Sequence, residues 1–346
     1  MSDNSELVKL YGAVLDLCKV APGEVLAVLT EGGDRANDVD AYLTAAEERG
    51  AHAFQVNLRK RPPTLGARAK QTSLTGNTPA VETLKAADIV IDLVGLLWSA
   101  EQKQIQQTGT RILMSREQPD VIRRMFPTEA LRHRVEASER MLAAAGELRI
   151  VSPAGTDITY RLGQYPVITQ YGYTDQPGRW DNLPGGFLYT GARDGEVNGV
   201  VVLNTGDIVF PFKRYLSNPI RMIVEKGMVT KIEGDHVDAE LLRAFMARWN
   251  DPRAYAVSHI GWGMDEKAQW DFMATSPLGA LTNGVDGRSF YGNVLFSTGP
   301  NAELGGTNDT GCHLDLPLRG CDLYLDGQTI VNEGQLVPPE LRAAGR

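Results

Sequence analysis

The first part of the chain alternates between helix-like and strand-like patterns of apolar residues. Residues 6–18 place apolar side chains at helical spacing, and short apolar runs then alternate with helix-length segments. The pattern predicts helices over 6–18, 36–48, 80–88, 99–109 and 129–146, and strands over 24–30, 51–58, 89–95 and 110–115. Strands separated by helix-length segments are typical of βαβ units, which build a parallel sheet.

The pattern changes after about residue 147. Short strand-like runs follow, separated by Gly, Pro, Asn and Asp: LRIVS, DITYRL, GFLYTG, GVVVLNT, IVFPF and IRMIVEKGMVTKIEG. Only residues 239–249 carry a clear helical pattern in this part. We therefore expect an α/β protein with two domains, an N-terminal βαβ parallel-sheet domain over 1–147 and a mainly β (α+β) C-terminal domain over 148–346.

Composition and charge limit the binding partners and the cellular compartment that we expect for this chain. The 346 residues are long for one core, which also favours two domains. A formal net charge of -8 argues against a nucleic acid or an anionic membrane as partner, because both require a basic surface. Three sparse cysteines indicate free thiols in a reducing compartment. No signal peptide and no apolar run of ~20 residues is apparent, so we expect a cytoplasmic protein.

Candidate chemistry begins in the stretch CHLDLPLRGCDLYLDG, residues 312–327. His313 and Asp315 stand two positions apart at the head of an alternating apolar run, so both side chains point to one face of the expected strand. A divalent metal ion would accept this imidazole and this carboxylate together. A surface histidine with a neighbouring aspartate gives the same short motif, so the pair needs a third ligand to define a metal site.

His259 supplies a second imidazole. It ends the strand-like run AYAVS and opens HIGWG, where two glycines allow close backbone approach and Trp262 offers an apolar wall. With His313 and Asp315 it forms two imidazoles and one carboxylate. This set matches the facial triad of Fe(II) oxygenases, which leaves positions open for substrate and O₂, and it equally matches a three-ligand zinc site with a bound water.

At these residues the chain resembles the 2,5-dihydroxypyridine 5,6-dioxygenases, ring-opening enzymes of bacterial nicotinic acid degradation. It is more distantly similar to the thermophilic-type leucyl aminopeptidases. The similarity runs almost end to end and is densest in residues 99–113, 163–190, 206–213, 258–263, 290–301 and 312–326. The resemblance implies a mononuclear Fe(II) centre held by His259, His313 and Asp315, and it implies Leu97 and Ser297 as residues that line the substrate pocket. It also implies a homo-oligomer, with a hexamer as the specific expectation. Separately, the extended C-terminal tail 334–346 is of a kind that could lie on a neighbouring chain.

The chain departs from the family pattern at three pocket positions. The dihydroxypyridine enzymes carry a histidine where this chain has Trp98, a glutamate where it has Gln170 and a histidine where it has Asn182. None of the three replacements titrates near neutral pH, whereas general acid–base help is typically worth ~10²–10⁴ in rate. We therefore expect these residues to contact a different hydroxylated or amino-substituted aromatic ring, a pyridine or a related heterocycle.

Two other functions stay open at this point. One is an aminopeptidase-type metallohydrolase that uses Zn(II) or Mn(II) at the same triad, and the other is a non-catalytic binding homologue. The related aminopeptidases bind two metals with extra glutamates, whose places here read Gly206-Asp207 and Gly292-Asn293. The missing carboxylate at Asn293 lowers the anionic charge available to a second divalent ion, which favours one metal.

Overall fold

The computed structural model describes residues 4–61, 71–210 and 212–345, and these divide into two compact units. The described part of the first unit is 4–61, 71–127 and 171–185, and that of the second is 128–170, 186–210 and 212–345. The expected strand 208–212 and the family block 206–213 both include Pro211, which lies outside the described residues.

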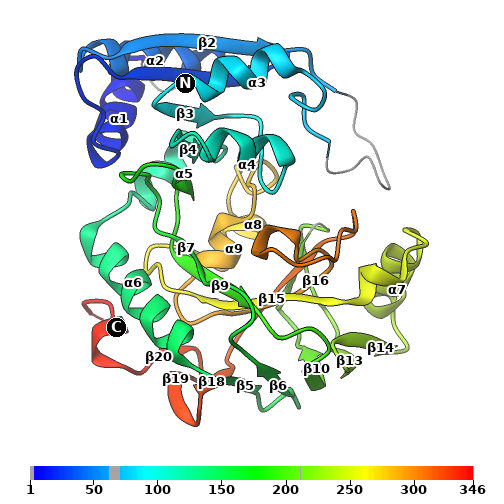
Figure 1. Cartoon of the computed structure of the whole chain (residues 1–346). Coiled ribbons are helices and arrows are strands. Elements are labelled where there is room, and N and C mark those ends of the chain that lie inside the picture. The colour runs from blue at the N-terminus through cyan, green and yellow to red at the C-terminus, as the bar shows by residue number, and fades with distance from the viewer. Residues whose placement is uncertain (1–3, 62–70, 211, 346) are drawn as a thin grey trace. The chain divides into compact units, whose positions relative to one another are not determined.

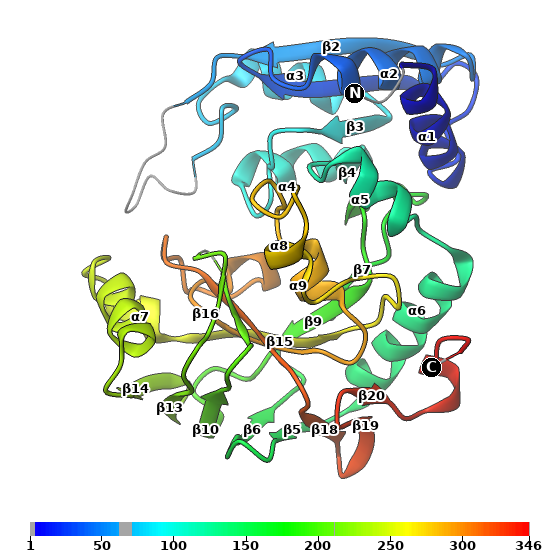
Figure 2. The same ribbon diagram turned by 180° about the vertical axis from the view of Figure 1, so that it is seen from behind.

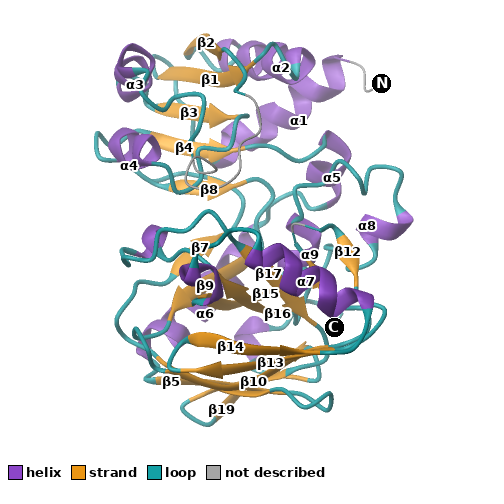
Figure 3. Ribbon diagram, turned by 90° about the vertical axis from the view of Figure 1, so that its right-hand side faces the viewer, coloured by secondary structure: helices purple, strands orange, loops and turns teal. Residues whose placement is uncertain are grey.

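The first unit is built on one parallel sheet, as predicted. Its strands β1 (Val25–Glu31), β2 (His52–Leu58), β3 (Ile89–Asp92), β4 (Arg111–Met114) and β8 (Trp180–Asn182) are arranged in the order β2-β1-β3-β4-β8. The described helices are α1 (Asn4–Leu17), α2 (Ala36–Glu47), α3 (Thr78–Lys85), α4 (Ala100–Gln106) and α5 (Pro119–Arg124). Figure 3 shows α1 and α2 grouped apart from α3 and α4 around the stacked strands. The α/β class and the parallel sheet are confirmed.

Helices α3 and α4 bury their apolar stripes against this sheet. Val81 and Leu84 of α3 and Ile105 of α4 share one core cluster with Ala27, Val90 and Ile112 of the strands. Asn77 and Ser99 cap the two helices, since each side chain accepts a hydrogen bond from a backbone N–H of the first turn. The caps fix where each helix begins and therefore where the preceding loop ends.

The second unit contains two antiparallel sheets. The larger one has the order β14-β13-β10-β6-β5-β18-β19-β20, and the smaller one has the order β17-β16-β15-β9-β7. Figures 1 and 2 show the strands of the larger sheet below β9, β15 and β16 of the smaller one. The larger sheet comprises β5 (Glu147–Val151), β6 (Asp157–Arg161), β10 (Val197–Leu203), β13 (Ile220–Glu225), β14 (Met228–Glu233), β18 (Asp322–Leu325), β19 (Gln328–Asn332) and β20 (Gln335–Leu336).

The smaller sheet, called the site sheet below, carries the candidate chemistry. It comprises β7 (Ile168–Gln170), β9 (Phe187–Gly191), β15 (Val257–Gly263), β16 (Val294–Thr298) and β17 (Leu314–Leu318), and a separate pair is formed by β11 (Ile208–Val209) and β12 (Arg214–Tyr215). The described helices of this unit are α6 (Glu129–Ala144), α7 (Val237–Ala247), α8 (Phe272–Thr275) and α9 (Val285–Ser289), with 3₁₀ turns η2 (Pro252–Tyr255), η3 (Ala302–Leu304) and η4 (Pro339–Leu341).

The observed units divide the chain differently from the expected boundary at 147/148. Helix α6 belongs to the second unit because it packs against β7 and β9. The segment 171–185 returns to the first unit because β8 adds a fifth parallel strand beside β4. With only three residues in a stretch rich in Gly and Pro, β8 carries too little periodicity to be recognised from sequence.

The C-terminal tail packs on its own unit rather than extending away from it. Strand β20 pairs with β19, and Leu341 and Ala343 are buried. The Ala343 N–H donates to the Tyr291 hydroxyl at 3.1 Å. The tail is therefore ordered by contacts within its own chain, and its packing on a neighbouring chain stays a prediction. In the part of the chain that the structure describes, no helix has the length and apolar character needed to span a membrane.

A buried carboxylate shapes the loop that leads to Leu97 and Trp98 in the first unit. Asp92 ends β3 and accepts hydrogen bonds from the backbone N–H groups of Val94, Gly95 and Leu96 at 2.7–2.9 Å. We expect Asp92→Ala to lower the free energy of unfolding by about 3 kcal/mol, because buried N–H groups would lose their acceptor. Urea titration followed by circular dichroism measures this change.

The matched control for that prediction is Asp92→Asn, which keeps one acceptor oxygen. Its loss of unfolding free energy should be smaller than that of Asp92→Ala, because part of the loop's hydrogen bonding survives. Equal unfolding midpoints for wild type and Asp92→Ala would show that the loop does not depend on this carboxylate.

Candidate metal centre

The site sheet brings the three predicted ligands together. The Oδ1 atom of Asp315 lies 3.2 Å from Nε2 of His259 and 3.2 Å from Nε2 of His313. One nitrogen or oxygen from each residue falls within a group of atoms no more than 4.8 Å apart, and this is the only such group of three among the residues that the structure describes. Two imidazole nitrogens and one carboxylate oxygen are a donor set that fits a divalent transition metal.

Strand pairing places Asp315 beside Ser297, which the resemblance implied as a pocket residue. Ser297 on β16 is directly opposite Asp315 on β17, and directly opposite residues project to the same face. The Ser297 hydroxyl lies 3.2 Å from Nε2 of His313, the residue just before β17. The i, i+2 relation of His313 and Asp315 thus produces the expected shared face.

A β-bulge positions His259 on this same face. The pairing of β15 with β16 shifts between Val257 and Ile260, so β15 carries one extra residue there. Counting back from the pair Ile260–Phe296 puts His259 against Ser297. In a regular strand adjacent side chains point to opposite faces, but the bulge breaks this alternation and lets the Ser258 hydroxyl reach Nδ1 of His259 at 3.2 Å.

The glycines of HIGWG have the predicted role, and Trp262 does not. A Cβ atom at Gly261 would lie 1.8 Å from the carbonyl oxygen of Leu188, so only glycine allows β9 and β15 to pair here. Trp262 stands three residues beyond His259 and therefore on the opposite face of the strand. The apolar side chain beside His259 is instead Tyr189 of β9, whose ring centre is 4.7 Å from the imidazole.

Two charged residues that sequence reasoning missed complete the site. Arg288 of α9 donates from Nε to Oδ2 of Asp315 at 2.6 Å, which leaves Oδ1 to face the histidines. The side chain of Glu303 in η3 is almost fully buried, and its Oε1 lies 3.6 Å from Nδ1 of His259. Both residues stand two positions outside the family block 290–301, which is the one sequence signal that pointed near them.

These contacts shift the pKa values of His259 and Asp315 away from their ordinary values. Burial alone would lower the pKa of His259, but the carboxylates of Asp315 and Glu303 outweigh it and raise that pKa to about 9. Burial alone would raise the pKa of Asp315, but His313, Arg288 and His259 hold it well below its ordinary value. The Asp315 carboxyl is therefore ionised at neutral pH, which is the form that binds a metal.

The remaining predicted pocket residues lie in different places. Leu97 and Trp98 follow β3 in the first unit. Trp98 has a left-handed backbone conformation with φ of 65°, and its backbone N–H donates to the side-chain oxygen of Gln102. Asn182 ends β8 in that unit and donates from Nδ2 to the Pro184 carbonyl oxygen at 3.0 Å. Gln170 ends β7 of the site sheet, in register with Phe187 and Gly263. Gly263 is about 13 Å along the strand from His259.

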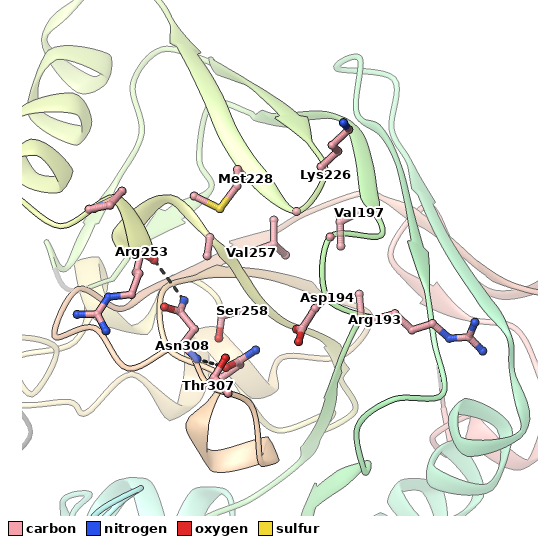
Figure 4. A pocket seen from close by; sticks show the side chains of 16 residues that line it. Arg193, Asp194, Val197, Lys226, Met228, Arg253, Val257, Ser258, Thr307 and Asn308 are labelled. Atoms are coloured by element: carbon pink, nitrogen blue, oxygen red, sulfur yellow. Dashed lines mark hydrogen bonds between the residues drawn. The ribbon is translucent and has the colours of Figure 1, made fainter.

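A separate cavity of about 400 Å³ opens at the start of β15 (Figure 4). Ser258 contributes to its lining, whereas none of the three predicted ligands does. The guanidinium groups of Arg193 and Arg253 point away from the cavity in this view. Arg253 is paired with Asp251 at 3.0 Å, and Arg193 donates to the Leu162 carbonyl oxygen. The cavity therefore lacks the converging positive charge of an anion site.

Comparisons with known proteins show the family to which the chain is similar. A family model described as 2,5-dihydroxypyridine 5,6-dioxygenase matches residues 6–338. The 2,5-dihydroxypyridine 5,6-dioxygenase of Pseudomonas putida KT2440 is 45% identical over 345 residues, covering 97% of each chain. A solved structure of 2,5-dihydroxypyridine dioxygenase from the same organism superposes with a TM-score of 0.94 at 44% identity, over 99% of this chain and 100% of that one.

A more distant structure shares the fold alone. Wild-type AmpT from Thermus thermophilus gives a TM-score of 0.61 at 15% identity, over 96% of this chain and 98% of that one. The resemblance noted in the sequence is thereby confirmed. Because the family model spans residues 6–338 and the curated relative is 45% identical along nearly the whole length, this chain belongs to the 2,5-dihydroxypyridine 5,6-dioxygenase family.

Proposed function

We propose that this chain is a mononuclear non-haem Fe(II) dioxygenase that opens a hydroxylated or amino-substituted aromatic or heteroaromatic ring. The observation that carries the proposal is the convergence of His259, His313 and Asp315 ligand atoms within 4.8 Å, in a chain of this family. Two neutral nitrogens and one anionic oxygen on one side of an ion leave the other side open, as ring-cleaving and other O₂-using Fe(II) sites require.

The chain's own residues would hold the ion and set its charge. His259 and His313 would bind through Nε2 and Asp315 through Oδ1, while Arg288 retains Oδ2 and keeps the carboxylate monodentate. When bound, Fe(II) would supply the adjacent open positions and the electrons with which O₂ and the ring react. The Ser297 hydroxyl lies beside Nε2 of His313 and would hydrogen-bond a polar substituent of a ring held there.

The aminopeptidase-type alternative is less well supported by the structure. The two carboxylate oxygens of Asp207 accept hydrogen bonds from the backbone N–H groups of Asn204 and Arg319, at 2.7 and 3.0 Å. Asn293 is neutral, and its amide donates to the Arg288 carbonyl oxygen. A second divalent ion would therefore find no free carboxylate at either of these two positions, whereas a two-metal hydrolase needs such anionic ligands.

The metal assignment predicts that His259→Ala, His313→Ala and Asp315→Ala each reduce bound iron from about one ion per chain to near none and abolish O₂ consumption, since a facial site has no spare ligand. Elemental analysis after anaerobic purification and an oxygen electrode measure the two quantities. His52→Ala is the matched control, because His52 is exposed on β2 in the first unit. Full iron content and activity in any one triad variant would remove that residue from the site.

The pocket substitutions generate a second prediction. Trp98, Gln170 and Asn182 cannot exchange protons near neutral pH, so the enzyme should turn over 2,5-dihydroxypyridine poorly compared with its own best ring. Its pH–rate profile should follow the ionisation of the substrate and lack a limb from a pocket His or Glu. Screening hydroxypyridines, aminophenols and hydroxybenzoates by O₂ consumption identifies that ring.

The triple variant Trp98→His, Gln170→Glu and Asn182→His tests the same idea in the other direction. It should gain activity on 2,5-dihydroxypyridine, although the smaller histidine at position 98 leaves a cavity that limits the gain. Wild-type turnover of 2,5-dihydroxypyridine at the rate of its best substrate would show that the three replacements are tolerated variation.

We also propose that the chain forms a homo-oligomer, as its family resemblance implies, with a hexamer as the specific expectation. Light scattering at micromolar concentration should give a mass several times that of one chain. A mass of 37.8 kDa, that of a single chain, would contradict the proposal.

A further inference from the structure

Glu303 is a buried carboxylate that needs an explanation. It lies in η3, just after β16, and its side chain is only 4% exposed. Both of its oxygens are buried and have no hydrogen-bond partner within the described part of the chain. The charged group beside it is the imidazole of His259, with 3.6 Å between Oε1 and Nδ1. An ionised carboxylate without a partner costs several kcal/mol in a protein interior, so a partner must offset this cost.

The hydrogen bonds of the Ser258 hydroxyl indicate which nitrogen of His259 carries the proton in the neutral ring. The Ser258 hydroxyl donates its one hydrogen to the Pro300 carbonyl oxygen. At the 3.2 Å contact between Ser258 Oγ and His259 Nδ1, the hydroxyl oxygen can then only accept. Nδ1 is therefore the N–H side of the neutral ring, and Nε2, which faces Asp315 Oδ1, is the nitrogen that would bind a metal ion.

A metal ion at the triad would interact with the charged groups that surround it. Arg288 is paired with Asp315 at 2.6 Å, so these two charges compensate each other. The Glu303 carboxylate lies on the Nδ1 side of His259, where the charge of an ion bound at Nε2 would offset it. An ion of charge +2 at Nε2 would draw electron density from the ring, strengthen the Nδ1–H as a donor and make Glu303 a better partner for it.

We infer that Glu303 is a positioning residue of the metal centre: its carboxylate pairs electrostatically with the Nδ1 side of His259 at 3.6 Å, favours the ring orientation that turns Nε2 toward the ion, and contributes a negative charge that favours cation binding. The inference rests on the proposed metal site but not on the ring-opening reaction. Metal–histidine–carboxylate arrangements of this kind raise the basicity of the ligand, and loss of the outer partner typically weakens metal affinity about 10–100-fold.

The test measures binding of Co²⁺ and Zn²⁺ to the metal-free full chain by calorimetry. Glu303→Ala should raise the dissociation constant about 10–100-fold, and Glu303→Gln, which keeps an acceptor oxygen without the charge, should fall between Glu303→Ala and wild type. The visible absorption of the Co²⁺ form should also shift in both variants, because the donor strength of His259 changes.

Matched controls separate positioning from folding. Glu117→Gln alters a glutamate of the first unit that is also buried, at 1% exposure, and it should leave the metal dissociation constant unchanged. Thermal melting of the metal-free variants shows whether Glu303 supports the fold by itself. We expect Glu303→Gln to melt no lower than wild type, because it removes a buried charge.

Dissociation constants within two-fold of wild type for both Glu303 variants would overturn the inference, and so would an unchanged Co²⁺ spectrum. Should Glu303→Ala fail to fold, the milder Glu303→Gln variant decides on the same two measurements. Wild type that binds neither Co²⁺ nor Zn²⁺ would defeat the metal site itself. Tight metal binding without any O₂ consumption would instead defeat the proposed dioxygenase while leaving the role of Glu303 intact.

Discussion

The candidate site depends on one oxygen atom, Oδ1 of Asp315, which stands at the same 3.2 Å from two imidazole nitrogens. This geometry exists because Asp315 is paired with Ser297 across β16 and β17 and is bound from behind by Arg288. Buried carboxylates survive when their charge is shared among fixed donors, and here the donors come from separate elements.

Part of this centre was predictable because it is encoded locally. His313 and Asp315 are two residues apart, and the period of a strand alone puts them on one face. His259 could be proposed because histidines are scarce in the chain and this one opens a glycine-rich turn of sequence. The parallel sheet of the first unit was predictable for a similar reason, since β1 to β4 and their helices each span enough residues to show their period.

The rest depends on contacts between residues far apart in the chain. Arg288 and Glu303 reach the triad from α9 and η3. Neither segment has a sequence pattern that predicts where its side chains point. Strand β8 is too short to show a recognisable period in the sequence, yet it brings Asn182 into the first unit. A chain cut at the expected boundary of 147 would therefore lose the fifth strand of that sheet and keep a helix that packs elsewhere.

The extra residue in β15 has a consequence for how the site can vary. In a regular strand, adjacent residues of the chain point to opposite faces, so a hydroxyl beside His259 would have to come from another strand. The bulge brings the hydroxyl of the preceding residue, Ser258, to the imidazole of His259. The choice of imidazole tautomer is thereby tied to the number of residues in one strand, and a single-residue deletion could alter it while all three candidate ligands were retained.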